Sequence, residues 1–276
     1  MKSYAKINIF LKITGKINNY HQLSSRFIKL DNLYDEIYML PKKDLLKYKE
    51  KSLYEIPFFS KKSEQIMKPI KHFEKDKIMN KYYYINENLL SNFYSESNIF
   101  DKVLNNIPEK IKLDFLTNYA IILHKNIPTF AGLGGASSNA ASFIKLLLKL
   151  GNFDKFEIAK KTGADVSFFI SDCKAANVSG YGEIINEFKD CDCNFNIYFS
   201  EPCSTQKVFY EFSKNPIYYE SDDLKNLNTI ELLKHSNYFL NDLLLPCEKI
   251  YQKVKELAKL GFFMSGSGGS FFTIKH

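Results

Sequence analysis

The sequence has few of the residues that would cross-link the chain or carry it through a membrane. Its five cysteines are odd in number and irregular in spacing, which argues against a disulfide framework and predicts free thiols. Cys191 and Cys193 form a C-x-C pair, but no second pair at metal spacing accompanies them, so no zinc site is predicted. No apolar run reaches the roughly 18 residues of a membrane span, and Met1 to Tyr4 lead straight into a strand pattern, not a signal peptide. We therefore expect a protein of the reducing cytoplasm with no membrane contact.

Tryptophan is absent, whereas Lys, Asn, Ile, Phe and Tyr are abundant, a bias that an AT-rich genome also produces. Hydrophobic residues make up 45% and charged residues 25% of the 276 residues, as in a globular protein with a sizeable core. The net charge of +7 suits a protein that handles anionic ligands such as nucleotides. Because the lysines are scattered and no aromatic nucleic-acid motif occurs, nucleic acid is not expected as a partner.

Strand-like and helix-like patterns are intermixed along the chain without regular β-α-β order, which predicts the α+β class. The alternation of apolar residues predicts strands at 3–14, 23–40, 120–124 and 196–200, a turn over 15–20 and a hairpin over 174–188. The helical spacing predicts helices from residue 97 or 98 to 107 and over 138–150, 156–162, 205–212 and 242–260. Residues 41–80 are lysine-rich and weakly periodic, and we expect a surface segment there.

The most informative local feature is Gly132-Leu133-Gly134-Gly135-Ala136-Ser137-Ser138, which stands just before an apolar helical pattern. Glycines let the backbone approach a ligand closely, and the N–H groups at a helix N-terminus can hold an anion. The segment is no P-loop, because no Lys follows the last glycine, and no dinucleotide fingerprint, because Ser137 stands where the third glycine belongs. An ordinary capped helix after a flexible glycine turn remains the alternative.

Three further features could belong to the same site. A second glycine-serine loop, residues 264–270, is bounded by strand patterns and could close over the same ligand, although such runs are also common turns. Lys6 lies on the polar side of the first strand, where it is either functional or simply solvated. Asp165 follows Gly163-Ala164 just before an apolar segment, where it is either a general base or a helix cap.

Taken in order, these segments resemble the motifs of the GHMP kinases, the superfamily of galactokinase, homoserine kinase, mevalonate kinase and phosphomevalonate kinase. Pro128-x-x-x-Gly132-Leu133-Gly134-x-x-Ser137-Ser138 resembles their central motif, and Met264-Ser265-Gly266-Ser267-Gly268 resembles their third motif. No motif aligns over residues 42–118 and 214–236. Two departures concern the loops: Phe130-Ala131 replace smaller or glycine residues, and Gly269-Ser270 replace the usual ending.

Within this superfamily the chain is most similar to the kinases of 4-diphosphocytidyl-2-C-methyl-D-erythritol. The segment Ala5 to Leu11 resembles their first motif, and the pair Tyr20-His21 separates them from other GHMP kinases. The segment Gly163 to Phe169 resembles their GADVPFF motif, with Ser167 in place of proline. Gly180-x-Gly182-Glu183 and Asn241-Asp242-Leu243 also fit.

The resemblance implies a two-domain α+β fold of the GHMP kinase type. Residues 1–178 would form an N-terminal domain like domain 2 of ribosomal protein S5, and residues 179–276 a C-terminal domain like the ferredoxin-like α/β-plait. It implies ATP-dependent phosphorylation of the 2-hydroxyl of the cytidylyl substrate, with ATP and Mg²⁺ as cofactors. A monomer or weak homodimer that binds a small-molecule substrate is expected.

The resemblance also assigns residues to roles. Lys6 and Asp165 would be the catalytic pair, Asp165 accepting the proton of the hydroxyl and Lys6 keeping Asp165 ionised. The phosphates of ATP would be held by Pro128, Thr129, Phe130, Ala131, Gly132, Leu133, Gly134, Gly135, Ala136, Ser137 and Ser138, with Ser138 the candidate ligand of Mg²⁺. The acceptor would be bound by Tyr20 and Phe209 on the two faces of its cytosine, by His21 at the edge of the ring, and by Asn8 and Lys125 at its polar groups.

Three alternatives stay open at this point. Another GHMP kinase, of the homoserine or mevalonate type, is disfavoured by Tyr20-His21 and by the context of Asp165. A non-catalytic nucleotide-binding protein on the same scaffold is disfavoured by the presence of both Lys6 and Asp165. A basic nucleic-acid-binding protein that shares part of the fold would not need two glycine-serine loops.

Overall fold

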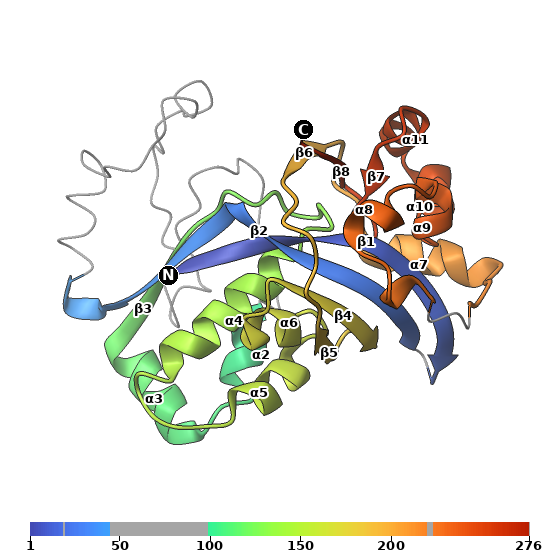
Figure 1. Ribbon diagram of the computed structural model, residues 1–276. Coiled ribbons are helices and arrows are strands. Elements are labelled where there is room, and N and C mark those ends of the chain that lie inside the picture. Colours follow the sequence, from blue (N-terminus) through green and yellow to red (C-terminus); the bar gives the residue numbers. More distant parts are fainter. Residues whose placement is uncertain (19, 45–98, 220–222, 276) are drawn as a thin grey trace.

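The computed structural model describes residues 1–18, 20–44, 99–219 and 223–275, and everything below concerns these residues. Two antiparallel sheets organise them, as Figure 1 shows. The larger sheet has the order β1-β2-β4-β5, with β3 also paired to β2. Its strands are β1 (Lys2–Ile17), β2 (Tyr20–Pro41), β3 (Tyr119–His124), β4 (Ala175–Gly180) and β5 (Ile184–Glu187). The predicted α+β class is confirmed, while the expectations for residues 45–98 lie outside the described part of the chain.

Strands β1 and β2 form a long hairpin whose turn is tighter than the sequence suggested. The predicted turn over 15–20 is wrong, because Gly15 pairs with Gln22 and Ile17 pairs with Tyr20. The register shifts at three places along the hairpin, which bends the strands and increases their twist. Lys6 is not a solvated lysine, because the polar residues of β1, Lys6, Asn8 and Lys12, are all buried. Helix α4 (Gly135–Leu147) of the N-terminal part and helices α8 (Thr229–Leu232) and α9 (Asn237–Leu240) of the C-terminal part all contact β1.

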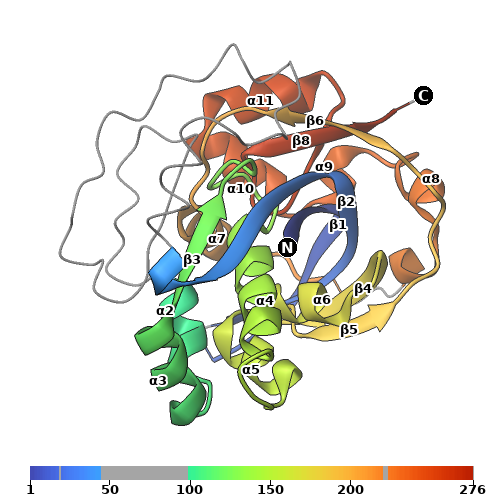
Figure 2. The same ribbon diagram turned by 90° about the vertical axis from the view of Figure 1, so that its left-hand side faces the viewer.

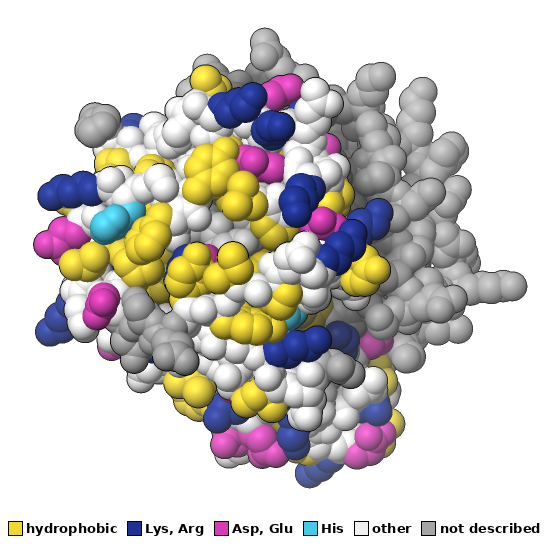
Figure 3. Space-filling model, turned by 90° about the vertical axis from the view of Figure 1, so that its right-hand side faces the viewer, with side chains coloured by type: hydrophobic (Ala, Val, Ile, Leu, Met, Phe, Trp, Pro, Cys, Tyr) yellow, Lys and Arg dark blue, Asp and Glu magenta, His cyan; other side chains and the backbone are white. Residues whose placement is uncertain are grey.

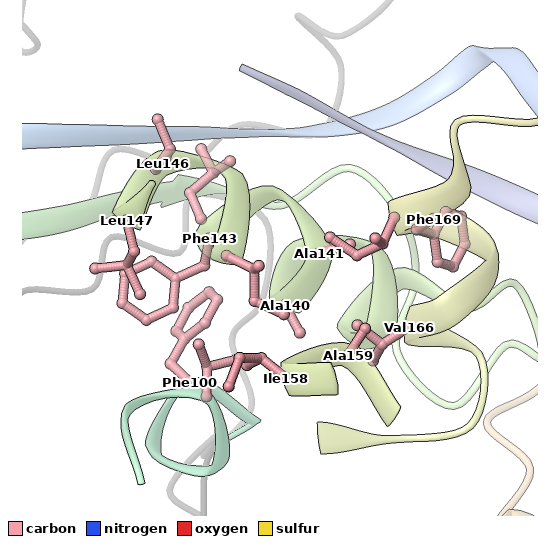
Figure 4. Close-up of a cluster of buried hydrophobic side chains, with 14 of the residues drawn as sticks. Phe100, Ala140, Ala141, Phe143, Leu146, Leu147, Ile158, Ala159, Val166 and Phe169 are labelled. Atoms are coloured by element: carbon pink, nitrogen blue, oxygen red, sulfur yellow. The ribbon is translucent and has the colours of Figure 1, made fainter. Parts of the chain in front are cut away.

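Five helices pack against the larger sheet in the lower part of Figure 1. They are α2 (Ile99–Leu104), α3 (Glu109–Asn118), α4 (Gly135–Leu147), α5 (Lys155–Thr162) and α6 (Val166–Ser171), and a 3-10 turn η1 (Lys42–Asp44) follows β2. Helix α4 begins at Gly135, earlier than the predicted Ser138, because the glycine loop itself supplies its first turn. It is buried on nearly all sides, and Figure 4 shows its side chains meeting those of α2 and α5. Phe143 of α4 makes edge-to-face contacts with Phe100 and Phe115, each at 5.1 Å.

The C-terminal part has its own sheet with the order β6-β8-β7, which lies beside helices α10 and α11 in Figure 2. Its strands are β6 (Phe195–Phe199), β7 (Phe263–Met264) and β8 (Ser270–Ile274). Its helices are α7 (Thr205–Lys214), η3 (Asp223–Lys225), α8 (Thr229–Leu232), α9 (Asn237–Leu240), α10 (Leu244–Ile250) and α11 (Gln252–Lys259). The single helix predicted over 242–260 is wrong, because Tyr251 is extended (φ −123°, ψ 111°) and its hydroxyl accepts a hydrogen bond from Ser204 N at 2.8 Å.

Three further predictions concern the cysteines, membrane-spanning helices and the domain boundary. Cys191 and Cys193 are joined by a disulfide across a turn that brings their Cα atoms to 5.7 Å, so the prediction of free thiols is wrong for these two. No helix of the described residues is long and apolar enough to cross a membrane. The predicted domain boundary after residue 178 falls within β4 and stays a prediction.

A buried ion pair ties the larger sheet to the C-terminal part. The guanidinium of Arg26, on β2, is fully buried and donates to Asp190 Oδ2 at 2.8 Å. It also donates to the carbonyl oxygens of Lys225 at 2.8 Å and Leu227 at 3.2 Å. Burial lowers the pKa of Arg26, and the hydrogen bond to Asp190 opposes that effect. The charge of Arg26 is thus compensated by one carboxylate and by the carbonyl groups that it holds in place.

Replacing Asp190 with alanine should lower the free energy of unfolding by about 3 to 5 kcal/mol, because it leaves the Arg26 charge buried without a carboxylate. Urea denaturation measures this loss. Glu157→Ala is the control, since it breaks the exposed pair between Lys161 and Glu157 on α5 (2.6 Å) and should cost no more than about 0.5 kcal/mol. Equal losses in the two variants would contradict the importance of the buried pair.

Candidate active site

A cavity of about 620 Å³ opens where the two glycine loops, β1, and the starts of α6 and α7 meet. This volume is in the range of small-molecule sites. The predicted site residues that line it are Lys6, Asn8, Lys125, Asp165, Phe209 and every residue from Pro128 to Ser137. Ser138, Tyr20 and His21 do not line it, and Ser138 is buried inside the first turn of α4. The structure therefore gathers most of the predicted site around one cavity.

Lys6 and Asp165 form the charged centre of the cavity. Lys6 Nζ lies 3.4 Å from Asp165 Oδ2, and Lys6 is only 4% exposed, whereas the side chain of Asp165 is 28% exposed. Lys6 is thus no solvated surface lysine. Asp165 stands at the N-cap position of α6, but its side chain makes no capping hydrogen bond. Its carboxylate is therefore available to the cavity, which favours the general-base interpretation over the helix-cap interpretation.

A chain of buried polar groups fixes the position of the Lys6 ammonium. Lys6 Nζ donates to Asn8 Oδ1 at 2.5 Å, and Asn8 Nδ2 donates to Ser25 Oγ at 2.9 Å. Ser265 Oγ, from the second glycine loop, accepts from Asn8 N at 3.2 Å and donates to Gly132 O at 3.1 Å. The Lys6 ammonium also lies 4.3 Å from the centre of the Phe27 ring. Asn8 is therefore engaged with Lys6 and Ser25 inside the protein.

The first glycine loop ends in an open helix N-terminus. Gly134 is the N-cap residue of α4 with φ 69°, and no side chain caps the helix. Gly135, Ala136 and Ser137, the first helical residues, line the cavity. Because the N–H groups of a first helical turn have no partner within the helix, they can donate to an anion, and the helix adds about half a positive charge. An open N-terminus facing a cavity favours the anion cradle over a plain capped helix.

The two glycine loops touch backbone to backbone. A Cβ on Gly132 (φ 72°) would come 2.4 Å from Ser265 O and 2.7 Å from Gly268 O. A Cβ on Gly269 (φ 90°) would come 2.3 Å from Phe130 O. Phe130 O also accepts from Cys203 N at 2.8 Å, and Phe130 itself has the strained φ of 55° with a ring that is 61% exposed. Only glycine at positions 132 and 269 allows the two loops to approach each other this closely.

Asp35 is fully buried near the open end of the β1–β2 hairpin. It binds the segment after β3 that leads into the first glycine loop. Its Oδ1 accepts from Asn126 N and Ile127 N, each at 2.8 Å. Its Oδ2 accepts from Lys125 Nζ and, at 2.9 Å, from Asn139 Nδ2 on α4. Lys125 and Asn139 both line the cavity, so one carboxylate fixes both sides of the phosphate loop. Lys125 reaches the cavity as a paired cation.

Aromatic side chains gather at the tip of the β1–β2 hairpin. His21 stacks on Phe209 of α7 with ring centres 5.5 Å apart and 28° between the planes. Tyr20 is 69% exposed and packs edge-to-face on Tyr181, at 5.7 Å. Figure 3 shows apolar side chains grouped in the middle of the face that lies at the right of Figure 1, where the hairpin tip and α7 are found. The predicted sandwich partners, Tyr20 and Phe209, thus each have a different neighbour.

The hydrogen bonds of His21 define its tautomer. Ser213 Oγ donates to Phe209 O at 2.9 Å, so it accepts from His21 Nε2 at 2.9 Å. His21 Nδ1 is then an unprotonated acceptor, and it has no hydrogen-bond partner among the described residues. Burial, and secondly the charge of Lys16, lower the pKa of His21. Both effects favour the neutral form of the ring.

Several residues of the site were not predicted from the sequence. Tyr181, Asn139, Thr205 and Ser267 line the cavity, and Asp35 and Ser265 hold residues that do. Thr205 Oγ1 and Ser267 Oγ lie 2.7 Å apart and connect the start of α7 to the second glycine loop. Tyr181 could have been found, because it stands between Gly180 and Gly182 in a segment that the resemblance covered. Asp35 carried no sequence signal of its own.

The sequence is similar to one protein family and to several proteins of known name. The family model of the GHMP kinases N terminal domain matches residues 98–172. A 4-diphosphocytidyl-2-C-methyl-D-erythritol kinase of Campylobacter jejuni is 35% identical over 290 residues, covering 99% of each chain. A kinase of the same name from Sulfurimonas denitrificans is 35% identical over 285 residues, covering 99% of this chain and 96% of its own.

Solved structures of related fold complete the comparison. A crystal structure of 4-(cytidine 5'-diphospho)-2C-methyl-D-erythritol kinase superposes with a TM-score of 0.69 at 21% identity, covering 100% of this chain and 90% of that one. Homoserine kinase from Cytophaga hutchinsonii superposes with a TM-score of 0.51 at 12% identity, covering 100% and 86%. At these identities the likeness is one of fold.

The contact between the loops can be tested at Gly132. Gly132→Ala should lower both the free energy of unfolding and the affinity for ATP, because the new Cβ would collide with the carbonyls of Ser265 and Gly268. Gly261→Ala is the matched control: its φ of 81° carries a similar backbone cost of about 1 kcal/mol, but nothing lies within 4 Å of its Cβ position. Thermal unfolding and calorimetric titration with ATP compare the two. If both variants behave alike, the close approach of the loops is not what shapes the site.

Proposed function

The chain belongs to the family of 4-diphosphocytidyl-2-C-methyl-D-erythritol kinases within the GHMP kinases, and we propose that it transfers the γ-phosphoryl group of ATP to the 2-hydroxyl of that substrate. The products would be ADP and the 2-phosphate, in the non-mevalonate route to isoprenoids. One observation carries the proposal: Lys6 and Asp165 meet 3.4 Å apart in the cavity that the open N-terminus of α4 also lines. We propose a cytoplasmic enzyme, monomeric or weakly dimeric, without nucleic acid as a partner.

Asp165 is proposed as the general base. Its partly exposed carboxylate would accept the proton of the acceptor hydroxyl as the oxygen forms its bond to the γ-phosphorus and ADP departs. Lys6 would pair with this carboxylate and would stabilise the negative charge on the transferring group. The hydrogen bond from Lys6 to Asn8 supports this role, because it holds the ammonium in place before the substrates arrive.

The phosphates of ATP are proposed to bind along residues 128–137, at the N–H groups of Gly135, Ala136 and Ser137. Ser138, the candidate metal ligand, is buried outside the cavity lining, which favours Ser137 over it as a donor to the metal. Mg²⁺ takes oxygen donors together with phosphates and water, and Ser137, which lines the cavity, is a suitable oxygen donor here. No group of three or more His, Cys, Asp or Glu that could hold a metal occurs among the described residues, which fits a metal carried mainly by the nucleotide. When bound, Mg²⁺ would neutralise phosphate charge.

The acceptor is proposed to place its cytosine at the aromatic end of the cavity. Phe209 lines the cavity and offers an apolar ring face to the base, and His21, whose Nδ1 is buried, stacks on Phe209 and would act at the edge of the base. Tyr20 belongs to the same aromatic group. Lys125, from the other side of the cavity, would contribute positive charge toward the phosphate groups.

A panel of acceptors tests the proposed function directly. ADP release from ATP should be rapid with 4-diphosphocytidyl-2-C-methyl-D-erythritol and at background level with homoserine or mevalonate. A coupled assay measures it with each acceptor at equal concentration. Turnover of homoserine or mevalonate in preference to the cytidylyl substrate would overturn the substrate assignment and keep only the GHMP kinase chemistry.

Asp165→Asn should lower kcat by roughly 10²- to 10⁴-fold and change the Kd for ATP by no more than about threefold, because the amide cannot accept the proton but fills the same space. Steady-state kinetics and calorimetry measure the two quantities. Asp172→Asn, at the exposed other end of α6, is the matched control and should keep normal turnover. Normal turnover in Asp165→Asn would exclude the base assignment.

A further inference from the structure

The chain passes from the larger sheet to the smaller one through residues 188–194, which connect β5 to β6 (Figure 1). Both ends of this connection are fixed by backbone hydrogen bonds. Phe188 N donates to a carbonyl oxygen of β4 at 3.0 Å, and Asn194 O accepts from the residue after β8 at 2.8 Å. Between these two points the disulfide of Cys191 and Cys193 closes a turn that lies outside the active-site cavity.

Both cysteines of this turn can be reached from solvent. Cys191 and Cys193 are half-buried and line a second cavity of about 320 Å³, which shares no lining residue with the active-site cavity. Of the other three cysteines, Cys203 and Cys247 are buried and Cys173 is half-buried. A thiol reagent therefore has access to the disulfide while the protein is folded.

The disulfide closes a very short loop, because the two cysteines are separated by one residue. A cross-link restricts the unfolded chain less when the loop it closes is shorter, so this one adds less to stability than a long-range disulfide would. Exposed disulfides are also more easily reduced, and those of cytoplasmic proteins are usually transient or sense redox state. These properties favour a bond that opens and closes over a permanent one.

The turn is bound to the carboxylate that pairs with Arg26. Cys191 N donates to Asp190 Oδ1 at 2.8 Å, and the same oxygen accepts from Thr229 N, also at 2.8 Å. Asp190 Oδ2 accepts from Thr229 Oγ1 at 2.7 Å and from Arg26 at 2.8 Å. Because Thr229 is the first residue of α8, Asp190 joins the disulfide turn, β2 and α8 at one point.

The other contacts of the turn among the described residues are weak. Cys193 N donates to Cys191 O at 3.0 Å within the turn itself. Asp192, between the two cysteines, pairs with Lys174 at 2.6 Å, but the two side chains are 88% and 59% exposed, and such a pair contributes little. The disulfide is therefore the main constraint that keeps the N–H of Cys191 directed at Asp190.

We propose that Cys191 and Cys193 form a reversible modification site, at which thiols reduce the disulfide and thereby loosen the attachment of the C-terminal part to the larger sheet. A thiolate of the reagent attacks one sulfur, forms a mixed disulfide and releases the other cysteine, which takes up a proton. A second reagent thiol then attacks the reagent sulfur of the mixed disulfide and releases the remaining cysteine. The protein gains two electrons and two protons, and the reagent leaves as its disulfide. A disulfide reagent reverses these steps.

Alkylation of the native full-length protein followed by mass spectrometry tests the modification. In mixtures of reduced and oxidised glutathione at pH 7, Cys191 and Cys193 should become open to alkylation together as the mixture becomes more reducing. Cys173 should be alkylated at every ratio, because it is free and half-buried. The melting temperature of the reduced protein should be lower by roughly 2 to 6 °C.

Serine variants connect this shift to the disulfide. Cys191→Ser and Cys193→Ser should each melt like the reduced protein at every glutathione ratio. Cys173→Ser is the matched control and should keep the redox-dependent shift, because Cys173 lies outside the turn. If the pair stays reduced in the folded protein with oxidised glutathione, or if it oxidises without a shift in melting temperature, the proposal is overturned.

Hydrogen exchange in the unmodified protein tests the connection through Asp190 and depends on no variant that has to fold. Reduction should speed exchange at residues 189–195 and also at residues 225–232, which Asp190 and Arg26 hold, while helix α4 should stay unchanged. Faster exchange at residues 189–195 alone, or equally throughout the chain, would contradict the role of Asp190. The proposed kinase activity does not depend on any of these results.

Discussion

The site depends on one contact, the backbone-to-backbone approach of two loops that lie more than a hundred residues apart. Gly132 and Ser265 meet at a distance that no Cβ on Gly132 would permit, and Gly269 meets Phe130 in the same way. Lys6 N donates to Leu133 O at 2.9 Å, so the first glycine loop is also bound to strand β1. An open helix N-terminus, a buried lysine and the C-terminal part of the chain are thereby brought to one place.

The second requirement is the placement of buried charge. Lys6, Lys12, Lys125 and Arg26 all leave water, and each has a carboxylate: Asp165, Asp242, Asp35 and Asp190 respectively. Burial is costly enough to raise the pKa of Asp242 although Lys12 opposes the shift. Buried ions are tolerated only when they are paired and hydrogen-bonded. The Lys6 pair differs from the other three. The side chain of its carboxylate, Asp165, is 28% exposed, whereas the carboxylates of the other pairs are at most 5% exposed. Three pairs thus hold the structure together, and one is left available for chemistry.

The sequence predicted the features that leave a local pattern. Alternation found β2 and β3, and the motif order identified the loops, Lys6 and Asp165 as parts of one site. It failed where distant packing decides: the polar face of β1 is buried by elements from both halves of the chain, and Tyr251 breaks a helical pattern because its hydroxyl binds Ser204 N. Asp35 could not be found, since its role depends on four donors that only the fold brings together.

The two ends of the cavity differ in whether the proposed contacts come from the backbone or from side chains. At the phosphate end the proposed donors are backbone N–H groups, so the side chains of Phe130 and Ala131 need not take part in binding. Phe130 adopts a left-handed backbone conformation (φ 55°), which costs about 1 to 2 kcal/mol. In this conformation its carbonyl oxygen accepts a hydrogen bond from Cys203 N. At the aromatic end the proposed contact is made by a side chain, the ring of Phe209, on which His21 stacks. Substrate choice can therefore change there without disturbing the phosphate cradle.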